Sequence, residues 1–368
     1  MNLQRLSFAL LLTLVLSHSC AFAQGTKAWA YIGWWLPDSW RSAPLDQFDR
    51  LLFFELKITA EGQIKERNGW PEQWGDLILA AEQANTPLDL TLTLLDASTF
   101  KRVFSSDKVT ARLLEEVLVL AAQQNVAGIH LDVEVYSAVE PRILDKYKYF
   151  VGELSRKLRE LTQPKKLSIF FPMGGASLLY DAITLGQIDM VVMQGYDTHW
   201  VGSKTAGPLA PLVGSESLTW SKTVALGVSL GIPKERMLMS FPLYGYEWQV
   251  KNPKLRGETI GTGVVTSFAP IALGKVPSIQ FNIQDRVKQY GASNDAQSGS
   301  SHYQFKAKNG QFFEGWFEDW WTLERKSDFL VKEELGGIAF FLLGYDGGHL
   351  VDHFLRRRGS RKALEITQ

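Results

Sequence analysis

The chain has 368 residues, and its 39 Lys and Arg against 39 Asp and Glu give a formal net charge of zero at pH 7. This balance leaves no basic surplus for nucleic acid, so we expect no nucleic-acid partner. The single cysteine excludes a disulfide within one chain. Stability must therefore come from a large apolar core, which a chain of this length can bury.

The first 23 residues have the pattern of an export signal. Arg5 precedes an apolar run over residues 6–16, and Ala-Phe-Ala at 21–23 then forms an A-x-A cleavage site. We expect a signal peptide over residues 1–23. The mature protein, 24–368, would then be exported to the periplasm or the exterior.

Two kinds of membrane attachment are not expected. Cys20 lies within the signal, but Ser17 three residues upstream is poorly suited to lipoprotein processing. The apolar run over 6–16 is too short to span a bilayer, and no later segment approaches about 18 uninterrupted apolar residues. We expect a monomer without a membrane span.

Short apolar segments alternate with longer amphipathic ones along the mature chain. Several of the short segments are apolar on both faces, as strands of a parallel sheet must be. The alternation predicts an α/β fold, a (β/α)8 TIM barrel. The predicted strands are 28–35, 50–58, 88–95, 128–135, 166–173, 188–196, 236–245 and 336–345, and the clearest predicted helices are 71–85, 110–125 and 140–161.

One connection is too long for a barrel loop. From about 249 to 315 the chain is rich in Gly, Pro, Ser and Asn, with patches of strand-like sequence. We interpret this segment as a small α+β insertion after the seventh strand. It would lie beside the mouth of the barrel.

The stretch AGIHLDVEVY, residues 127–136, combines a buried strand with ionisable side chains. Strand residues two apart point the same way, so His130, Asp132 and Glu134 share one face. Catalytic groups in this barrel lie at the carboxyl ends of the strands, which favours Glu134 as the residue nearest the site. The alternative is a buried polar network with satisfied hydrogen bonds. Three such groups in so apolar a run favour function.

The spacing of these carboxylates limits the chemistry. Most glycosidases place two carboxylates on either side of the scissile bond, which neighbours on one strand cannot do. Glu134 is suited to be a general acid whose pKa is raised by apolar surroundings and by Asp132. Asp132 would then orient a nucleophile that the substrate supplies, such as a 2-acetamido oxygen.

Several segments together resemble glycoside hydrolase family 18, the chitinase family. LDVEVY is similar to the end of its D-x-x-D-x-D-x-E signature. Further similar segments follow in the family's order along nearly the whole mature chain. They are VVMQGYDTHW with AGPLAPL (191–212), SFPLYGYEW (240–248), GWFEDWWTLERK (315–326) and GGIAFFLLGYD (336–346).

The resemblance implies a role for each matching residue. Glu134 matches the catalytic acid/base, and Asp132 matches the residue that holds the acetamido group. Tyr196 matches the tyrosine that hydrogen-bonds the acetamido carbonyl. Further expected sugar contacts lie around these three, and they are Gln194, Asp197, Tyr244, Trp248, Phe341, Trp35, His130 and Glu55.

The chain departs from the family pattern around the reacting sugar. Ala127 and His130 replace the first two signature aspartates, and Phe341 replaces the tryptophan beneath the sugar. We expect His130 to hydrogen-bond Asp132, and a charged imidazole would keep Asp132 ionised. Glu55 stands where an aromatic residue is expected, either as a further polar group of the site or at its rim.

These observations predict an exported hydrolase of β-linked N-acetylglucosamine polysaccharide, chitin-like, that needs no cofactor. Two alternatives stay open. One is a sugar-binding protein without activity, and the other is a hydrolase of peptidoglycan or exopolysaccharide. His349 and His353 are spaced as metal ligands on a helix, but the start of the last helix explains them better, and we expect no metal.

Overall fold

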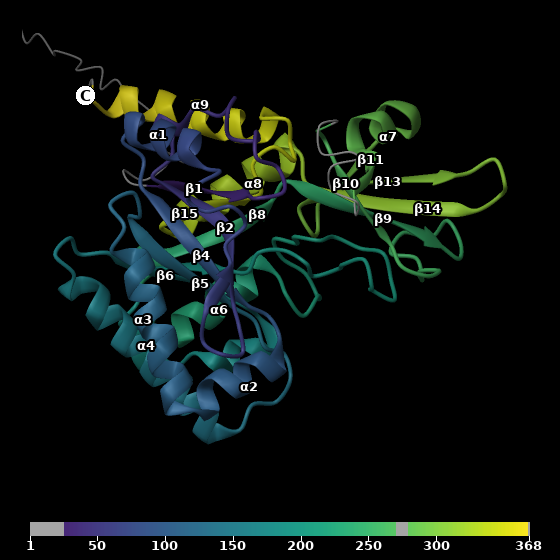
Figure 1. The fold of residues 1–368 in the computed structure, drawn as a ribbon. Coiled ribbons are helices and arrows are strands. Elements are labelled where there is room, and N and C mark those ends of the chain that lie inside the picture. Colours follow the sequence, from purple (N-terminus) through teal and green to yellow (C-terminus); the bar gives the residue numbers. More distant parts are fainter. Residues whose placement is uncertain (1–25, 270–278, 367–368) are drawn as a thin grey trace, which may run out of the picture.

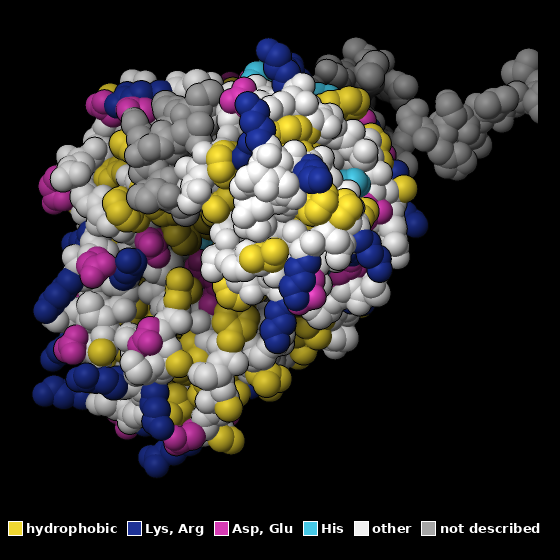
Figure 2. Space-filling view, turned by 90° about the vertical axis from the view of Figure 1, so that its right-hand side faces the viewer, with side chains coloured by type: hydrophobic (Ala, Val, Ile, Leu, Met, Phe, Trp, Pro, Cys, Tyr) yellow, Lys and Arg dark blue, Asp and Glu magenta, His cyan; other side chains and the backbone are white. Residues whose placement is uncertain are grey.

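The computed structural model describes residues 26–269 and 279–366, with side chains as far as Arg358. The expected signal peptide and Cys20 lie outside the described residues. Within these ranges no helix is long and apolar enough to cross a membrane. On the face seen in Figure 2, basic and acidic side chains are interspersed over the surface.

Eight parallel strands of the described chain close into a barrel, which confirms the predicted (β/α)8 fold (Figure 1). Closure comes from β1 pairing with β15 on one side and β2 on the other. Every predicted strand is present, although 236–245 is divided between β8 and the first inserted strand. The barrel strands are β1 (Lys27–Gly33), β2 (Arg50–Ile58), β4 (Leu88–Leu94), β5 (Gly128–Val133), β6 (Lys166–Phe171), β7 (Met190–Met193), β8 (Met237–Pro242) and β15 (Gly337–Phe341).

Helices surround the barrel (Figure 1). The predicted helix 110–125 begins earlier, at residue 107, because the Ser106 side chain accepts the N–H of Val109 and caps that end. The short strand β3 (Ile64–Glu66) pairs antiparallel with β2. The helices are α1 (Gly75–Gln83), α2 (Ala97–Ser105), α3 (Asp107–Ala121), α4 (Pro141–Glu160), α5 (Ala182–Gly186), α6 (Trp220–Ser229), α8 (Trp320–Lys332) and α9 (His349–Ile366), with 3-10 turns η1 (Leu45–Gln47), η2 (Gly174–Leu179) and η3 (Lys234–Arg236).

A second sheet projects from one side of the barrel (Figure 1). Its six described strands run in the order β11-β10-β9-β14-β13-β12, and the chain enters it from β8 and returns through α8 to β15. The insertion therefore follows the seventh barrel strand. Its elements are β9 (Tyr244–Val250), β10 (Val264–Ser267), β11 (Ile279–Asn282), α7 (Ile283–Tyr290), β12 (Ser293–Asp295), β13 (Ser300–Lys306) and β14 (Phe312–Phe317).

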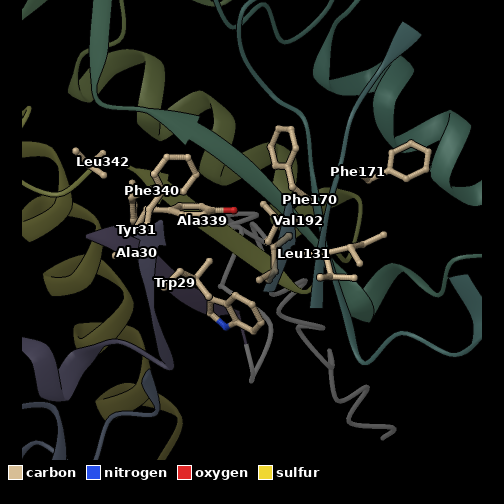
Figure 3. Packing of buried hydrophobic residues seen from close by; sticks show 14 of the residues in the cluster. Trp29, Ala30, Tyr31, Leu131, Phe170, Phe171, Val192, Ala339, Phe340 and Leu342 are labelled. Atoms are coloured by element: carbon tan, nitrogen blue, oxygen red, sulfur yellow. The ribbon is translucent and has the colours of Figure 1, made fainter. Parts of the chain in front are cut away.

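Apolar side chains of the barrel strands form the main core (Figure 3). Trp29, Leu131, Phe171, Val192 and Phe340 come from five different strands, and each is at most 3% exposed. Fully burying an aliphatic or aromatic side chain of this size contributes about 1.5–3 kcal/mol. A shared core therefore fixes the strands relative to one another. It also fixes the positions of the side chains at the ends of these strands.

A buried ion pair joins the inserted sheet to the barrel. The Nζ of Lys326 on α8 lies 2.6 Å from an Oε of Glu318, and both side chains are 0% exposed. Ser300 donates a hydrogen bond to the other Glu318 oxygen at 2.7 Å, and Lys326 also donates to the carbonyl of Gly299. The Lys326 ammonium lies 5.8 Å from the ring of Trp220 on α6. The pair thus connects β13 and the end of β14 to two barrel helices.

We expect Lys326→Met to lower the free energy of unfolding by about 3–5 kcal/mol, because it leaves Glu318 buried without its cation. Chemical denaturation of the purified protein measures this change. Lys332→Met, at the exposed end of the same helix, is the matched control and should change stability by less than about 0.5 kcal/mol. Equal loss in both variants would contradict a specific role for the buried pair.

Candidate active site

Asp132 and Glu134 lie at the carboxyl end of β5, as the strand pattern predicts. Asp132 is 7% exposed, and its Oδ1 has no hydrogen-bond partner among the described residues. Glu134 directly follows the strand and is half-buried, and its N–H donates to the carbonyl of Leu94 at 3.1 Å. That bond extends the pairing of β4 and β5 and fixes where Glu134 leaves the sheet.

A cavity of about 670 Å³ opens beside Glu134. Glu134 and Asp197 are the carboxylates in its wall, and five of the other lining residues are aromatic. Apolar walls with a few convergent polar groups are typical of a site for a small ligand or a sugar ring. The aromatic lining residues are Tyr136, Phe170, Tyr196, Trp200 and Tyr246.

The two carboxylates of β5 retain protons unusually well. Burial raises the pKa of Asp132 well above its ordinary value, and the charges of Glu134 and Glu55 add to this effect. Burial also raises the pKa of Glu134, while hydrogen bonds from Tyr136 and Asp132 oppose that rise. Both carboxyls therefore favour the protonated form more than exposed ones would, and the deeper Asp132 does so more strongly.

The segment after β7 brings Gln194, Tyr196 and Asp197 to the cavity. Asp197 adopts a left-handed backbone with φ of 64°, which turns its side chain toward the inserted sheet. The hydroxyls of Tyr244 and Tyr246 on β9 each donate to its Oδ1 at 2.7 Å. Asp197 thus joins the barrel to the insertion at the cavity wall, and burial raises its pKa.

Gln194 supports the loop of Met173, which also lines the cavity. Its Oε1 accepts the N–H of Met173 at 2.6 Å, and its Nε2 donates to the carbonyl of Tyr196 at 3.2 Å. The oxygen and the nitrogen of the side-chain amide therefore each form a hydrogen bond with a backbone group. Gln194 lies beside Tyr196, and its contact with a sugar stays a prediction.

An aromatic cluster lies at the centre of the barrel mouth. The ring of Phe341, at the end of β15, lies 5.3 Å from Tyr31, 5.4 Å from Phe54 and 5.7 Å from Tyr196. Trp35 packs 5.8 Å from Phe54, and its Nε1 donates to the hydroxyl of Tyr345 at 3.0 Å. Phe341 thus stands beside Tyr196, where a platform for a sugar is expected.

His130 corrects one expectation. It is 0% exposed, its Nε2 lies 2.8 Å from the Tyr31 hydroxyl, and its Nδ1 lies 2.8 Å from Ser168 Oγ. Burial, with a smaller effect of Arg50, lowers the pKa of His130 to about 3. The imidazole is therefore neutral and bridges β1, β5 and β6 below the site. The expected hydrogen bond to Asp132 is not formed among the described residues, and the ring has no exposed surface to offer a ligand.

Trp248 also differs from expectation, and the burial of Glu55 decides between its two expected positions. Trp248 is 1% exposed, and its Nε1 donates to the carbonyl of Trp200, so it supports the cavity wall from behind. Trp200 itself is 53% exposed and lines the cavity. Glu55 is 8% exposed and accepts the hydroxyl of Thr93 at 2.6 Å, so it belongs to the barrel interior rather than the rim.

Sequence reasoning missed four aromatic residues of the cavity, namely Tyr136, Phe170, Trp200 and Tyr246. Two of them were detectable by strand alternation. Phe170 is two residues after the inward Ser168, and Tyr246 is two residues after Tyr244. The other two, Tyr136 and Trp200, lie in loops, where side chains follow no regular alternation that could predict their direction.

No group of three or more His, Cys, Asp or Glu in the described ranges is arranged to hold a metal ion. His349 is the first residue of α9, and His353 Nε2 lies 3.3 Å from Glu324. The Asp346 carboxylate accepts the N–H groups of Gly348, Leu350 and Val351, so these residues form the start of the last helix.

Comparison with known proteins gives the family. The family model described as Glycosyl hydrolases family 18 matches residues 39–346. The chain belongs to this family. The resemblance seen in the sequence is thereby confirmed over most of the mature chain.

Relatives and solved structures of this family share limited identity with the chain. The cortical fragment-lytic enzyme of Bacillus anthracis is 23% identical over 316 residues, which cover 80% of this chain and 64% of that protein. The chain therefore spans just under two thirds of that relative. Chitinases from Chromobacterium violaceum and Cycas revoluta share the fold, with TM-scores of 0.70 and 0.72 at 19% and 16% identity. They cover 92% and 91% of this chain and 99% of their own.

We expect His130 to stay neutral in the folded protein from pH 8 to about pH 4, because burial lowers its pKa from 6.5 to about 3. The unfolded chain takes up this proton as the pH falls below about 6.5. The stability that the neutral ring contributes is thus present above pH 6.5 and is lost as the pH falls toward 3.

Imidazole nitrogen shifts in NMR, assigned with His130→Asn, measure the protonation state directly. Denaturation at pH 7 and pH 4.5 measures its linkage to stability, and the decline should be shallower in His130→Asn. A ring that titrates between pH 5 and 7 would contradict the buried neutral state.

Proposed function

We propose that the protein hydrolyses β-linked N-acetylglucosamine polysaccharide by a substrate-assisted, retaining mechanism. The observation that carries this proposal is the pairing of Asp132 and Glu134 beside the cavity. One Asp132 oxygen has no hydrogen-bond partner among the described residues, and in the proposed mechanism Asp132 accepts an amide N–H from the ligand. Glu134 is half-buried at the cavity wall, with a raised pKa suited to a general acid.

The reaction follows from these positions. Glu134 donates its proton to the glycosidic oxygen as the bond to the anomeric carbon breaks. The acetamido carbonyl oxygen of the same sugar attacks that carbon and forms an oxazolinium ring. Asp132 accepts the amide N–H and stabilises the positive charge of the ring.

Water completes the cycle. Glu134, now ionised, removes a proton from water as the water attacks the anomeric carbon and opens the oxazolinium ring. Two inversions give net retention of the β configuration. The mechanism requires Glu134 to carry the proton and Asp132 to be ionised when the amide N–H reaches Asp132. In this mechanism Tyr196 hydrogen-bonds the acetamido carbonyl.

The charge of the cavity favours a neutral sugar chain. Among the described residues that line it, Glu134 and Asp197 are acidic and none is Lys, Arg or His. An N-acetylglucosamine unit carries no charge, whereas the lactyl carboxylate of N-acetylmuramic acid would meet two acidic side chains. A chitin-like polymer is therefore the first candidate.

Peptidoglycan is the second candidate. The name of the Bacillus anthracis relative, a cortical fragment-lytic enzyme, favours a cell-wall glycan. A sugar-binding protein without activity is the third, because His130 and Phe341 replace family residues. A screen of chitin, peptidoglycan and poly-N-acetylglucosamine, scored for both binding and cleavage, separates these candidates.

We expect the purified protein to cleave chito-oligosaccharides with retention, and Glu134→Gln to lower kcat by about 10²–10⁴-fold. Glu115→Gln, the same change at an exposed position of α3, should keep full activity. Fully de-N-acetylated oligosaccharides should resist cleavage because they lack the internal nucleophile. Equal activity of Glu134→Gln and wild type would reject the assignment.

We also propose that residues 1–23 direct export. Expression in a bacterial host followed by fractionation should place the protein outside the cytoplasm, with a mature N-terminus at Gln24. A chain lacking 1–23 is the control and should stay in the cytoplasm. Full-length protein in the cytoplasm with an uncleaved N-terminus would contradict export.

A further inference from the structure

A tyrosine hydroxyl contacts the carboxylate of Glu134. Tyr136 Oη donates a hydrogen bond to Glu134 Oε2 at 2.5 Å, and the Tyr136 ring lines the cavity. We propose that Tyr136 is a positioning residue that holds one oxygen of Glu134 and sets the pH range in which the acid can act. This inference rests on the proposed role of Glu134 as the acid/base.

The loop that carries Tyr136 is fixed by its surroundings. It lies between the end of β5 and α4, and its backbone carbonyl approaches Gly175 in η2. A Cβ added at Gly175 would lie only 3.1 Å from the Tyr136 oxygen. The close approach of the two backbones favours glycine at 175. The ring itself is 56% exposed, so removing its hydroxyl leaves the core untouched.

The hydrogen bond favours the ionised form of Glu134. A phenol that donates to a carboxylate stabilises the negative charge, and bonds to charged groups are stronger than neutral ones. Burial and the negative charge of Glu134 raise the pKa of the Tyr136 phenol, so it remains a donor throughout the range in which carboxyls titrate. Tyr136 therefore opposes the burial that favours protonated Glu134.

Other ionisable groups face Glu134 from several elements. Their effect is present with or without the Tyr136 hydroxyl, so a change at this one atom isolates its contribution. These groups are Asp132 on β5, Asp197 after β7, Tyr196 beside it, Tyr31 on β1 and Tyr180 after η2.

The two halves of the reaction place opposite demands on Glu134. Bond cleavage requires the protonated acid, and hydrolysis of the oxazolinium requires the carboxylate. By holding Oε2, Tyr136 leaves Oε1 to face the glycosidic oxygen. By stabilising the carboxylate, it favours the second half-reaction and limits activity at high pH.

Tyr136→Phe tests this role. Loss of the hydroxyl raises the pKa of Glu134, so the basic limb of the kcat/KM profile should move upward by about one pH unit. Tyr149→Phe removes a hydroxyl from an exposed position of α4 and is the matched control, with an unchanged profile. A change confined to KM, or an equal change in both variants, would overturn the proposal.

A titration in the free protein separates this inference from the proposed function. The pH dependence of the Glu134 carboxyl, followed by infrared difference spectra against Glu134→Gln, needs no substrate. An upward shift in Tyr136→Phe supports the coupling, even if no polysaccharide is cleaved and the proposed function falls. An unshifted carboxyl with an unshifted activity profile would overturn the role of Tyr136, whatever the substrate.

Discussion

The site depends on the burial of ionisable side chains on one face of a single strand. His130, Asp132 and Glu134 alternate along β5 with Ile129, Leu131 and Val133, which are almost fully buried in the core. Since the pleat fixes this alternation, the polar groups must face the barrel interior. An ionised carboxylate there is costly without partners. Burial therefore raises the pKa of Asp132, so that its protonated form is favoured. Glu134, at the end of the strand, is only half-buried and lines the cavity.

The residues beneath the pair show how the family signature can change while the site remains. His130 takes the place of an acid, yet its two nitrogens are satisfied by Tyr31 and Ser168 from neighbouring strands. The neutral ring adds no positive charge that would hold Asp132 ionised. Glu55 instead adds a negative charge that raises the pKa of Asp132 further. Burial and the two neighbouring carboxylates thus act together to favour the protonated form of Asp132.

The sequence predicted the barrel and the acid pair because both follow from local pattern. Strands that are apolar on both faces and a strand with alternating carboxylates are visible without tertiary contacts. The partners of His130 were not predictable, since they come from strands 38 and 99 residues away. The sequence predicts Trp248 in the cavity, whereas the structure has Trp200 there. The orientation of the inserted sheet depends on tertiary packing, which the sequence pattern does not show. Tyr136 lies in a loop, where only the structure brings its hydroxyl to Glu134.

The inserted sheet is part of the site rather than an appendage. Tyr244 and Tyr246 on β9 hold Asp197, and Trp248 on the same strand supports the loop of Trp200 from behind. Three alternate residues of one inserted strand therefore fix the wall that faces Glu134. The geometry of that wall depends on how the insertion docks on the barrel, and the buried pair of Lys326 and Glu318 lies where the two meet. The same inserted sheet therefore carries both the cavity wall and the buried pair that joins it to the barrel.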